Sequence, residues 1–209
     1  MFKVRVPATS ANVGPGFDTL GMALSTYNTY TFRKIKEKLV LLGVEKEFDN
    51  EDNLIYRAML KTWEYLNVEP IHVEIDVDTQ ISITRGLGSS AACVIAGIVG
   101  AAKMADTTLS NHVILEIAMM LEGHPDNITP ALIGGMTIAT SIDGKIEFME
   151  LDIVDQYSFY AFIPPFSTST EEARGILPAS VTMEDAVFNV SRASMLIASL
   201  VSGKQQFLR

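Results

Sequence analysis

The sequence has 209 residues, of which 48% are hydrophobic and 20% charged, and its formal net charge is −9 at pH 7. A chain of this length and composition can bury a sizeable core, which excludes an intrinsically disordered protein. Phosphate neutralisation needs a basic face that this composition does not supply, so no nucleic-acid partner is expected.

The chain has one cysteine, Cys93, which excludes an internal disulfide framework and indicates a reducing compartment. The neighbours of Cys93 are small and apolar, so it is expected to be a core residue and not a nucleophile. The sequence shows no secretory signal and no stretch of about 18 apolar residues, so we expect a cytoplasmic protein with no membrane partner.

The first third of the chain predicts two strands, a loop and a helix. Polar and apolar side chains alternate at residues 3–7, which predicts a short strand, and residues 8–21 contain enough glycine, proline and asparagine to predict a shaped loop. Apolar residues at helical spacing predict a helix over residues 53–66, with Asp52 as its cap. A half-buried strand is predicted at residues 71–77.

The middle of the chain predicts two further helices. A glycine-rich turn at residues 85–90 leads into a small-residue helix over residues 91–105, which is apolar on nearly all sides and should be buried. Ser110 is expected to cap the next helix, which runs to about Glu122 and ends at Gly123.

The last third predicts a hairpin, a strand and two helices. Residues 136–142 and 145–151 flank an Asp-Gly pair, which is a strong signal for a β-hairpin. Residues 157–163 predict another strand, and helical patterns follow near residues 171–176 and 183–201.

The glycine-rich turn has the sequence Arg-Gly-Leu-Gly-Ser-Ser-Ala-Ala, from Arg85 to Ala92. Glycines let the backbone turn sharply and let a ligand approach closely. The helix that follows offers unpaired N–H groups and a positive dipole end, which together suit an anion. The two serines can cap the helix, coordinate a metal, or do both. The alternative is an ordinary glycine turn with a serine cap.

Two other phosphate-binding patterns are excluded. A Walker A loop requires Gly-Lys before Ser or Thr, and the sequence has no such segment. Gly86, Gly88 and Ala91 match the dinucleotide pattern G-x-G-x-x-A, but a further helix follows where that fold needs a second parallel strand.

The turn resembles the second motif of the GHMP kinases (galactokinase, homoserine kinase, mevalonate kinase, phosphomevalonate kinase), with Ser82 in place of that motif's proline. The resemblance implies an α+β GHMP kinase fold, with a ribosomal-protein-S5-domain-2-like domain over residues 1–150 and an incomplete ferredoxin-like C-terminal domain over residues 151–209. It also implies that ATP binds at the following residues, of which the last would touch the adenine: Ser82, Ile83, Thr84, Arg85, Gly86, Leu87, Gly88, Ser89, Ser90, Ala91, Ala92 and Asn53.

The run from Pro7 to Gly21 is similar, at essentially every position, to the N-terminal motif of the homoserine kinases within that family. This loop carries the amide of Asn12 and the carboxylate of Asp18, and a carboxylate suits an ammonium group. The resemblance implies that both residues hold the amino end of L-homoserine. The alternative is a loop whose Asn and Asp residues only make their own turns.

The run that begins at Glu122 resembles the homoserine kinase segment E-G-H-P-D-N-x-x-P-A-L-x-G-G. By this resemblance Glu122 and Ser90 bind Mg²⁺, which prefers hard oxygen ligands. Glu116 is the alternative ligand. His124 either contacts the substrate or is a loop histidine with backbone contacts, and Asn127 would lie near the substrate hydroxyl.

Residues 169–174 resemble the family segment S-T-x-x-A-R, which implies that Thr170 and Arg174 bind the substrate. A guanidinium group suits a planar carboxylate because it can donate two parallel hydrogen bonds. Taken alone, the segment is a helix-capping pattern followed by a surface arginine.

Together the resemblances imply ATP-dependent phosphorylation of the side-chain hydroxyl of L-homoserine to O-phospho-L-homoserine, a step of threonine biosynthesis. Ser90, Glu122 and Asn127 would be the catalytic residues, without a dedicated protein base. The family normally continues into a third glycine-rich motif and a second substrate-binding arginine, which this chain lacks. The alternatives are therefore an inactive GHMP-fold pseudokinase and a kinase of another small alcohol. A homodimer is expected from the family only.

Overall fold

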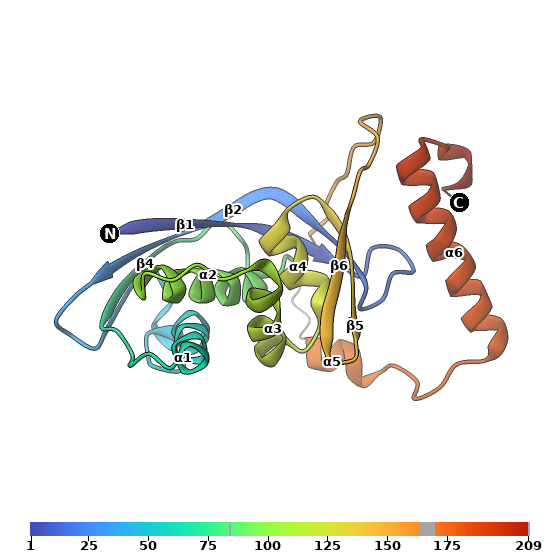
Figure 1. Ribbon diagram of the computed structural model, residues 1–209. Helices are drawn as coiled ribbons and strands as arrows, with labels where there is room; N and C mark the ends of the chain where they lie inside the picture. The colour runs from blue at the N-terminus through green and yellow to red at the C-terminus, as the bar shows by residue number, and fades with distance from the viewer. Residues whose placement is uncertain (84, 164–169, 209) are drawn as a thin grey trace.

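A computed structural model describes residues 1–83, 85–163 and 170–208, with the side chains of residues 170–172 left out (Figure 1). The strands are β1 (Phe2–Ala11), β2 (Leu20–Lys34), β3 (Leu39–Leu42), β4 (Val73–Asp78), β5 (Met136–Ile142) and β6 (Lys145–Leu151). The α-helices are α1 (Leu54–Leu66), α2 (Ser89–Met104), α3 (Asn111–Glu122), α4 (Pro125–Ile133), α5 (Thr170–Gly175) and α6 (Met183–Ser202).

A six-stranded sheet organises the fold. Its order is β3-β4-β2-β5-β6, and β1 pairs with β2. The pairings are antiparallel except between β3 and β4. Because β2 is 15 residues long, its first part pairs with β5 and its last part with β4. One strand therefore spans the sheet and connects its two ends.

Helices α1 to α4 cover one face of the sheet (Figure 1). The strand β4 directs Val73, Ile75 and Val77 into the core that lies between sheet and helices. Trp63 of α1 is fully buried, and its indole N–H donates a hydrogen bond to the carbonyl of Ala101 in α2, at 3.1 Å. The small side chains of α2 let it lie close to both α1 and the sheet.

Most of the elements predicted from periodicity are confirmed. These are α1, α2, α3, α5, α6, β4 and the hairpin of β5 and β6. Ser110 caps α3, and Gly123 ends it in the left-handed conformation. The predicted cap of α1 is wrong. Asn53, and not Asp52, is the N-cap, because the Oδ1 atom of Asn53 accepts a hydrogen bond from the Ile55 amide at 2.9 Å.

Two predictions on loops and strands are also wrong. The predicted loop over residues 8–21 is shorter, because β1 continues through Ala11 by pairing with Gly21 after a register shift between Pro7 and Thr9. Residues 157–163 contain no regular strand. Tyr160 and Phe162 are 80% and 93% exposed, and among the described residues no strand edge pairs with this segment. An apolar run needs such a partner for its backbone hydrogen bonds.

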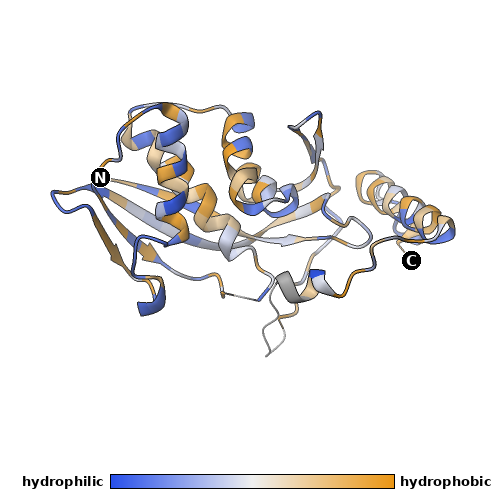
Figure 2. Ribbon diagram, turned by 90° about the horizontal axis from the view of Figure 1, so that it is seen from below, coloured by the Kyte–Doolittle hydropathy of each residue, from blue (hydrophilic) through white to orange (hydrophobic). Residues whose placement is uncertain are grey.

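The helix α6 lies apart from helices α1 to α3, and hydrophobic residues are distributed along it (Figures 1 and 2). It packs through Leu200 on a second, small hydrophobic cluster with Leu20, Met136 and Leu151. Many of its other apolar side chains are exposed, including Val190 at 68%. Among the residues that the structure describes, no helix is long and apolar enough to span a membrane.

Candidate active site

The glycine-rich turn lies against β1. The Thr9 amide donates a hydrogen bond to the carbonyl of Leu87 at 3.0 Å. Gly88, the N-cap of α2, has a φ of 64°, and a Cβ atom there would lie 1.9 Å from the Thr9 hydroxyl oxygen. Only glycine satisfies both the backbone conformation and this close approach. Since Gly88 has no side chain with which to cap α2, the first N–H groups of the helix are available to an anion.

Ser90 and Glu122 form an oxygen pair beside that helix terminus. The Ser90 hydroxyl donates a hydrogen bond to Oε2 of Glu122 at 3.1 Å, so these two predicted metal ligands lie together. Burial raises the pKa of Glu122, while the Ser90 hydrogen bond and the charge of His124 oppose that shift. The described residues contain no cluster of three His, Cys, Asp or Glu side chains that could hold a metal. A serine and a carboxylate fit Mg²⁺, which usually completes its shell with phosphates and water.

The start of α4 lies between this pair and the N-terminal loop. Asn127 accepts a hydrogen bond on Oδ1 from the Thr9 hydroxyl at 2.7 Å, so it touches the same threonine as the glycine-rich turn. The helix can lie this close to β2 because Gly21 has no Cβ, which would come within 1.7 Å of the Asp126 carbonyl oxygen. His124 is the N-cap residue of α4 and makes no side-chain capping bond.

Asp126 is a buried carboxylate at the centre of the site. Its side chain is 3% exposed, and burial raises its pKa. The negative charge of Asp18 raises that pKa further, whereas His124 and Arg174 lower it. Glu122 also experiences the charge of Asp126. The Ser90–Glu122 pair and the loop of Asp18 therefore influence a common group.

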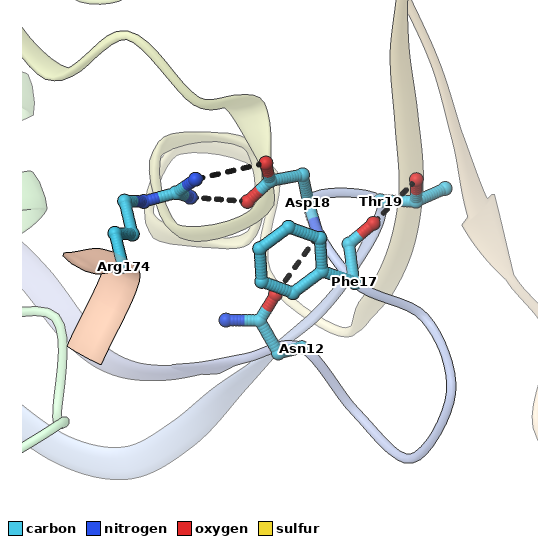
Figure 3. A network of polar contacts seen from close by, with 5 residues as sticks. All are labelled: Asn12, Phe17, Asp18, Thr19 and Arg174. Atoms are coloured by element: carbon cyan, nitrogen blue, oxygen red, sulfur yellow. Dashed lines mark hydrogen bonds and ion pairs between the residues drawn. The ribbon is translucent and has the colours of Figure 1, made fainter. Parts of the chain in front are cut away.

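Asp18 and Arg174 form a two-pronged ion pair (Figure 3). Nη2 of Arg174 bonds Oδ1 of Asp18, and Nη1 bonds Oδ2 at 3.3 Å. The Asp18 amide donates to Oδ1 of Asn12 at 2.8 Å, which closes the loop between β1 and β2. The guanidinium carbon of Arg174 lies 5.2 Å from the centre of the Phe17 ring. The side chains of Asp18 and Arg174 are each about one-third exposed, at 31% and 32%.

The ion pair brings together two residues that the sequence assigned to opposite ends of a substrate. By resemblance to the family motifs, Asp18 is predicted to bind the substrate ammonium and Arg174 its carboxylate. In the structure each charge neutralises the other, and the Nε atom of Arg174 is buried without a hydrogen-bond partner. A zwitterion that binds here would therefore replace one charge pair with two.

Other predicted site residues are placed less directly. Ser82 and Ile83 are exposed beside the turn, while Ala91 and Ala92 are buried, so only their backbone can reach a ligand. The amide of Asn53 caps α1 and donates to the Phe48 carbonyl, so its contact with adenine stays a prediction. Thr84 lies outside the described residues, and Thr170 begins α5 without a described side chain.

Thr9, Phe17 and Asp126 are site residues for which the sequence motifs predict no role. All three lie within the runs that resemble family motifs, so their position was a usable signal. Two hollows of about 440 and 900 Å³ lie elsewhere on the protein, and none of the predicted site residues lines them. The candidate site is an open one, built where the turn before α2, the start of α4 and the loop before β2 meet.

The sequence and the fold of this chain match known proteins. Residues 53–135 match the family described as the GHMP kinases N terminal domain. A homoserine kinase from Clostridium beijerinckii is 45% identical over 210 residues, with coverage of all of this chain and 70% of the relative. A homoserine kinase from Clostridium botulinum (strain ATCC 19397 / Type A) is 44% identical, with coverage of 97% and 68%.

A solved structure agrees with these relatives. The crystal structure of homoserine kinase from Cytophaga hutchinsonii superposes with a TM-score of 0.82 at 26% identity, over 99% of this chain and 69% of that one. The predicted α+β GHMP kinase fold is thereby confirmed, and fold and site together define a GHMP kinase. Within that class, the chain belongs to the homoserine kinase family. It spans about 70% of the length of its relatives. The domain boundary near residue 150 stays a prediction.

Proposed function

We propose that this chain transfers the γ-phosphoryl group of ATP to the side-chain hydroxyl of L-homoserine. Phosphoryl transfer is achieved mainly by positioning and by neutralising charge, so the relevant question is which groups hold each reactant. The three motifs that meet at the site supply a phosphate-binding helix terminus, an oxygen pair and a pair of opposite charges. These three parts support the proposed class of reaction.

The N-terminus of α2 is proposed to bind the triphosphate. Gly86 and Gly88 both have positive φ, at 70° and 64°, and present backbone without a Cβ. The N–H groups of Ser89 and the residues that follow it lie at the positive end of the helix dipole. The anionic phosphates therefore gain hydrogen bonds and a favourable field at the same place.

Ser90 and Glu122 are proposed to hold Mg²⁺. Bound there, the ion would neutralise charge on the phosphate oxygens. The residues themselves must present two oxygens with the carboxylate ionised. The Ser90 hydroxyl favours the ionised form, because its hydrogen bond to Glu122 lowers the pKa that burial raises. Glu122 is thus poised to accept a cation.

Asp18 and Arg174 are proposed to bind the amino-acid end of homoserine. The substrate ammonium would replace Arg174 at the Asp18 carboxylate, and the substrate carboxylate would take the guanidinium of Arg174. The side-chain oxygen of Asn12 keeps Asp18 in place by accepting a hydrogen bond from the Asp18 backbone amide. This exchange requires both charges on one ligand, which favours an amino acid over a neutral alcohol.

Asn127 is proposed to lie near the reacting hydroxyl, with His124 as a further substrate contact. Its Oδ1 atom accepts a hydrogen bond from Thr9, whose amide also bonds the glycine-rich turn, and this supports a place for both reactants beside this threonine. An amide cannot remove a proton. The loose transition state of phosphoryl transfer makes a dedicated protein base unnecessary, because the hydroxyl loses its proton late.

The Asp18–Arg174 ion pair is the observation that carries the choice of substrate. The test is a coupled assay with ATP and Mg²⁺, comparing L-homoserine with mevalonate, galactose and shikimate. We expect turnover with L-homoserine and none with mevalonate, galactose or shikimate, because these three alcohols carry no ammonium group. Turnover with one of those alcohols instead would contradict the substrate, and retained ATP binding without any turnover would identify a pseudokinase.

A further inference from the structure

Asn28 is a buried polar residue of β2 that none of the motifs includes. Its side chain is 2% exposed. The Oδ1 atom accepts two hydrogen bonds from successive backbone amides, those of Gln80 at 2.7 Å and Ile81 at 2.9 Å. These amides belong to the segment that leaves β4 and leads directly into the glycine-rich turn. One side chain thus fixes the backbone immediately before the turn.

The other end of the Asn28 amide reaches towards the helix that follows the turn. Nδ2 donates a hydrogen bond to the Tyr30 hydroxyl at 3.2 Å. That hydroxyl lies 3.7 Å from Sγ of Cys93, which is in the second turn of α2. A continuous buried chain of polar groups therefore connects the segment before the turn with the helix after it.

The side chains of Asn28, Tyr30 and Cys93 are all uncharged near neutral pH. Burial raises the pKa of Tyr30 above the usual range of tyrosine, and burial raises the pKa of Cys93 to about 11. Tyrosine therefore keeps its proton and the thiol stays a weak donor or acceptor. An uncharged chain holds its geometry without a desolvated ion, which suits a positioning role.

We propose that Asn28 is a positioning residue that fixes the phosphate-binding turn from its N-terminal side. The inference rests on the proposed function, in which ATP binds at this turn. Ser82 and Gly86 are exposed, so burial does little to restrain these two positions. On the C-terminal side Thr9 already holds Leu87. Asn28 supplies the matching restraint at residues 80 and 81.

A substitution that removes the acceptor leaves two backbone N–H groups without a partner in a buried place. Such groups are costly, so the segment would move until water satisfied them. The turn would then present its N–H groups in several arrangements, and ATP would bind more weakly. Homoserine would not be affected in the same way, because Asp18 and Arg174 lie on other elements.

The experiment compares ligand binding in wild type, Asn28→Ala and Asn28→Asp by calorimetry with MgATP and with L-homoserine. For Asn28→Ala we expect the Kd of ATP to rise about tenfold, while the Kd of homoserine stays within about twofold. Asn28→Asp keeps an oxygen acceptor for both amides and should recover most of the loss. Hydrogen exchange of the amides of residues 85–92 should be faster in Asn28→Ala and normal in Asn28→Asp.

Two further variants separate positioning from simple loss of stability. Thr62→Ala removes a buried hydrogen bond within α1, from the Thr62 hydroxyl to the Ala58 carbonyl. Because this helix precedes the turn in the chain, the variant should leave the ratio of the Kd for ATP to the Kd for homoserine unchanged. Ser82→Pro added to Asn28→Ala fixes φ at the start of the turn and should restore part of the ATP affinity.

The outcomes are distinguishable. If wild type binds ATP and Asn28→Ala binds it equally well, the positioning role is wrong while the proposed function stands. Equal weakening of ATP and homoserine binding in Asn28→Ala would also overturn the role, because it indicates a general loss of structure. If wild type does not bind ATP, the proposed function is wrong and the inference falls with it.

Discussion

The two sides of the site are held in different ways. On the proposed nucleotide side, the buried uncharged residues Thr9 and Asn28 hydrogen-bond to the turn and to the segment before it. On the substrate side, Asp18 and Arg174 are each about one-third exposed and hold one another by charge. The loop of Asp18 rests on the small cluster around Leu200 of α6, not on the main core.

This difference indicates which side adapts to its ligand. A turn held by the core presents its N–H groups in one arrangement before ATP arrives, so little ordering cost remains at binding. A charge pair near the surface exchanges partners more easily, because solvent screens the separated charges. We therefore expect binding of ATP to depend on packing and binding of homoserine to depend on charge.

The largest expected effect comes from removing the Asp18 charge. Asp18→Ala should lower kcat/KM for homoserine about 100-fold, because a charge-assisted hydrogen bond to the ammonium is lost, and should leave the KM for ATP unchanged. The measurement is steady-state kinetics with each substrate varied. The double variant Asp18→Arg, Arg174→Asp restores an ion pair without the proposed arrangement. Recovery of activity in it would show that the pair is structural only.

Gly88→Ala should have the next largest effect, and on the other substrate. A Cβ at 1.9 Å from the Thr9 hydroxyl oxygen, at a φ of 64°, forces the turn away from β1, so the KM for ATP should rise about 30-fold. Gly144→Ala is the matched control, since Gly144 also has a positive φ, of 76°, but a Cβ added there would have no atom within 4 Å. An equal effect of both substitutions would mean that backbone strain alone is responsible.

The pH dependence tests the metal-binding pair between the two sides. The raised pKa of Glu122 means that the folded protein holds this proton at a higher pH than the unfolded chain does. Stability contributed by the neutral form is lost as pH rises from the ordinary glutamate range through the raised pKa. Mg²⁺ needs the ionised form, so its apparent affinity should fall about tenfold per pH unit below that raised pKa.

Glu122→Gln separates these two consequences. At neutral pH the variant should unfold at a higher temperature than wild type, because it removes a partly buried charge, and the difference should vanish in acid. Its Mg²⁺ affinity should be low and nearly independent of pH. Thermal unfolding and Mg²⁺ titration across pH provide both readouts. A Tm below that of wild type at neutral pH would show that ionised Glu122 stabilises the fold.

The smallest effect is expected from the support of the substrate loop. Leu200 is 3% exposed, and its neighbour on the same helix, Leu196, would lie 3.0 Å from a Cβ at Gly14 of the loop. Leu200→Ala should therefore raise the Kd of homoserine about threefold without a change for ATP. Val190→Ala, on the exposed side of α6, is the control. A larger change for ATP than for homoserine would break the distinction between the two sides.

The local elements followed from the sequence because their signals are local. The alternation of polar and apolar residues predicted β4, and a run of small residues predicted the buried helix α2. Ser110 and Gly123 predicted the two ends of α3. The motif resemblances gave the family, since a match over a whole run is specific. The predicted strand at residues 157–163 did not form, because a strand also depends on a neighbouring edge that its own sequence does not encode.

Only the tertiary structure decided which groups meet. The pairing of Asp18 with Arg174 joins residues 156 positions apart, and the bonds of Asn28 to Gln80 and Ile81 join positions 52 and 53 apart. No local pattern specifies such contacts, because they depend on how β2 crosses the sheet and where α5 lies. The sequence by itself determined the family and the candidate residues of the site. The fold determined that the proposed nucleotide side is anchored in the core and that the proposed substrate side is held by a pair of opposite charges.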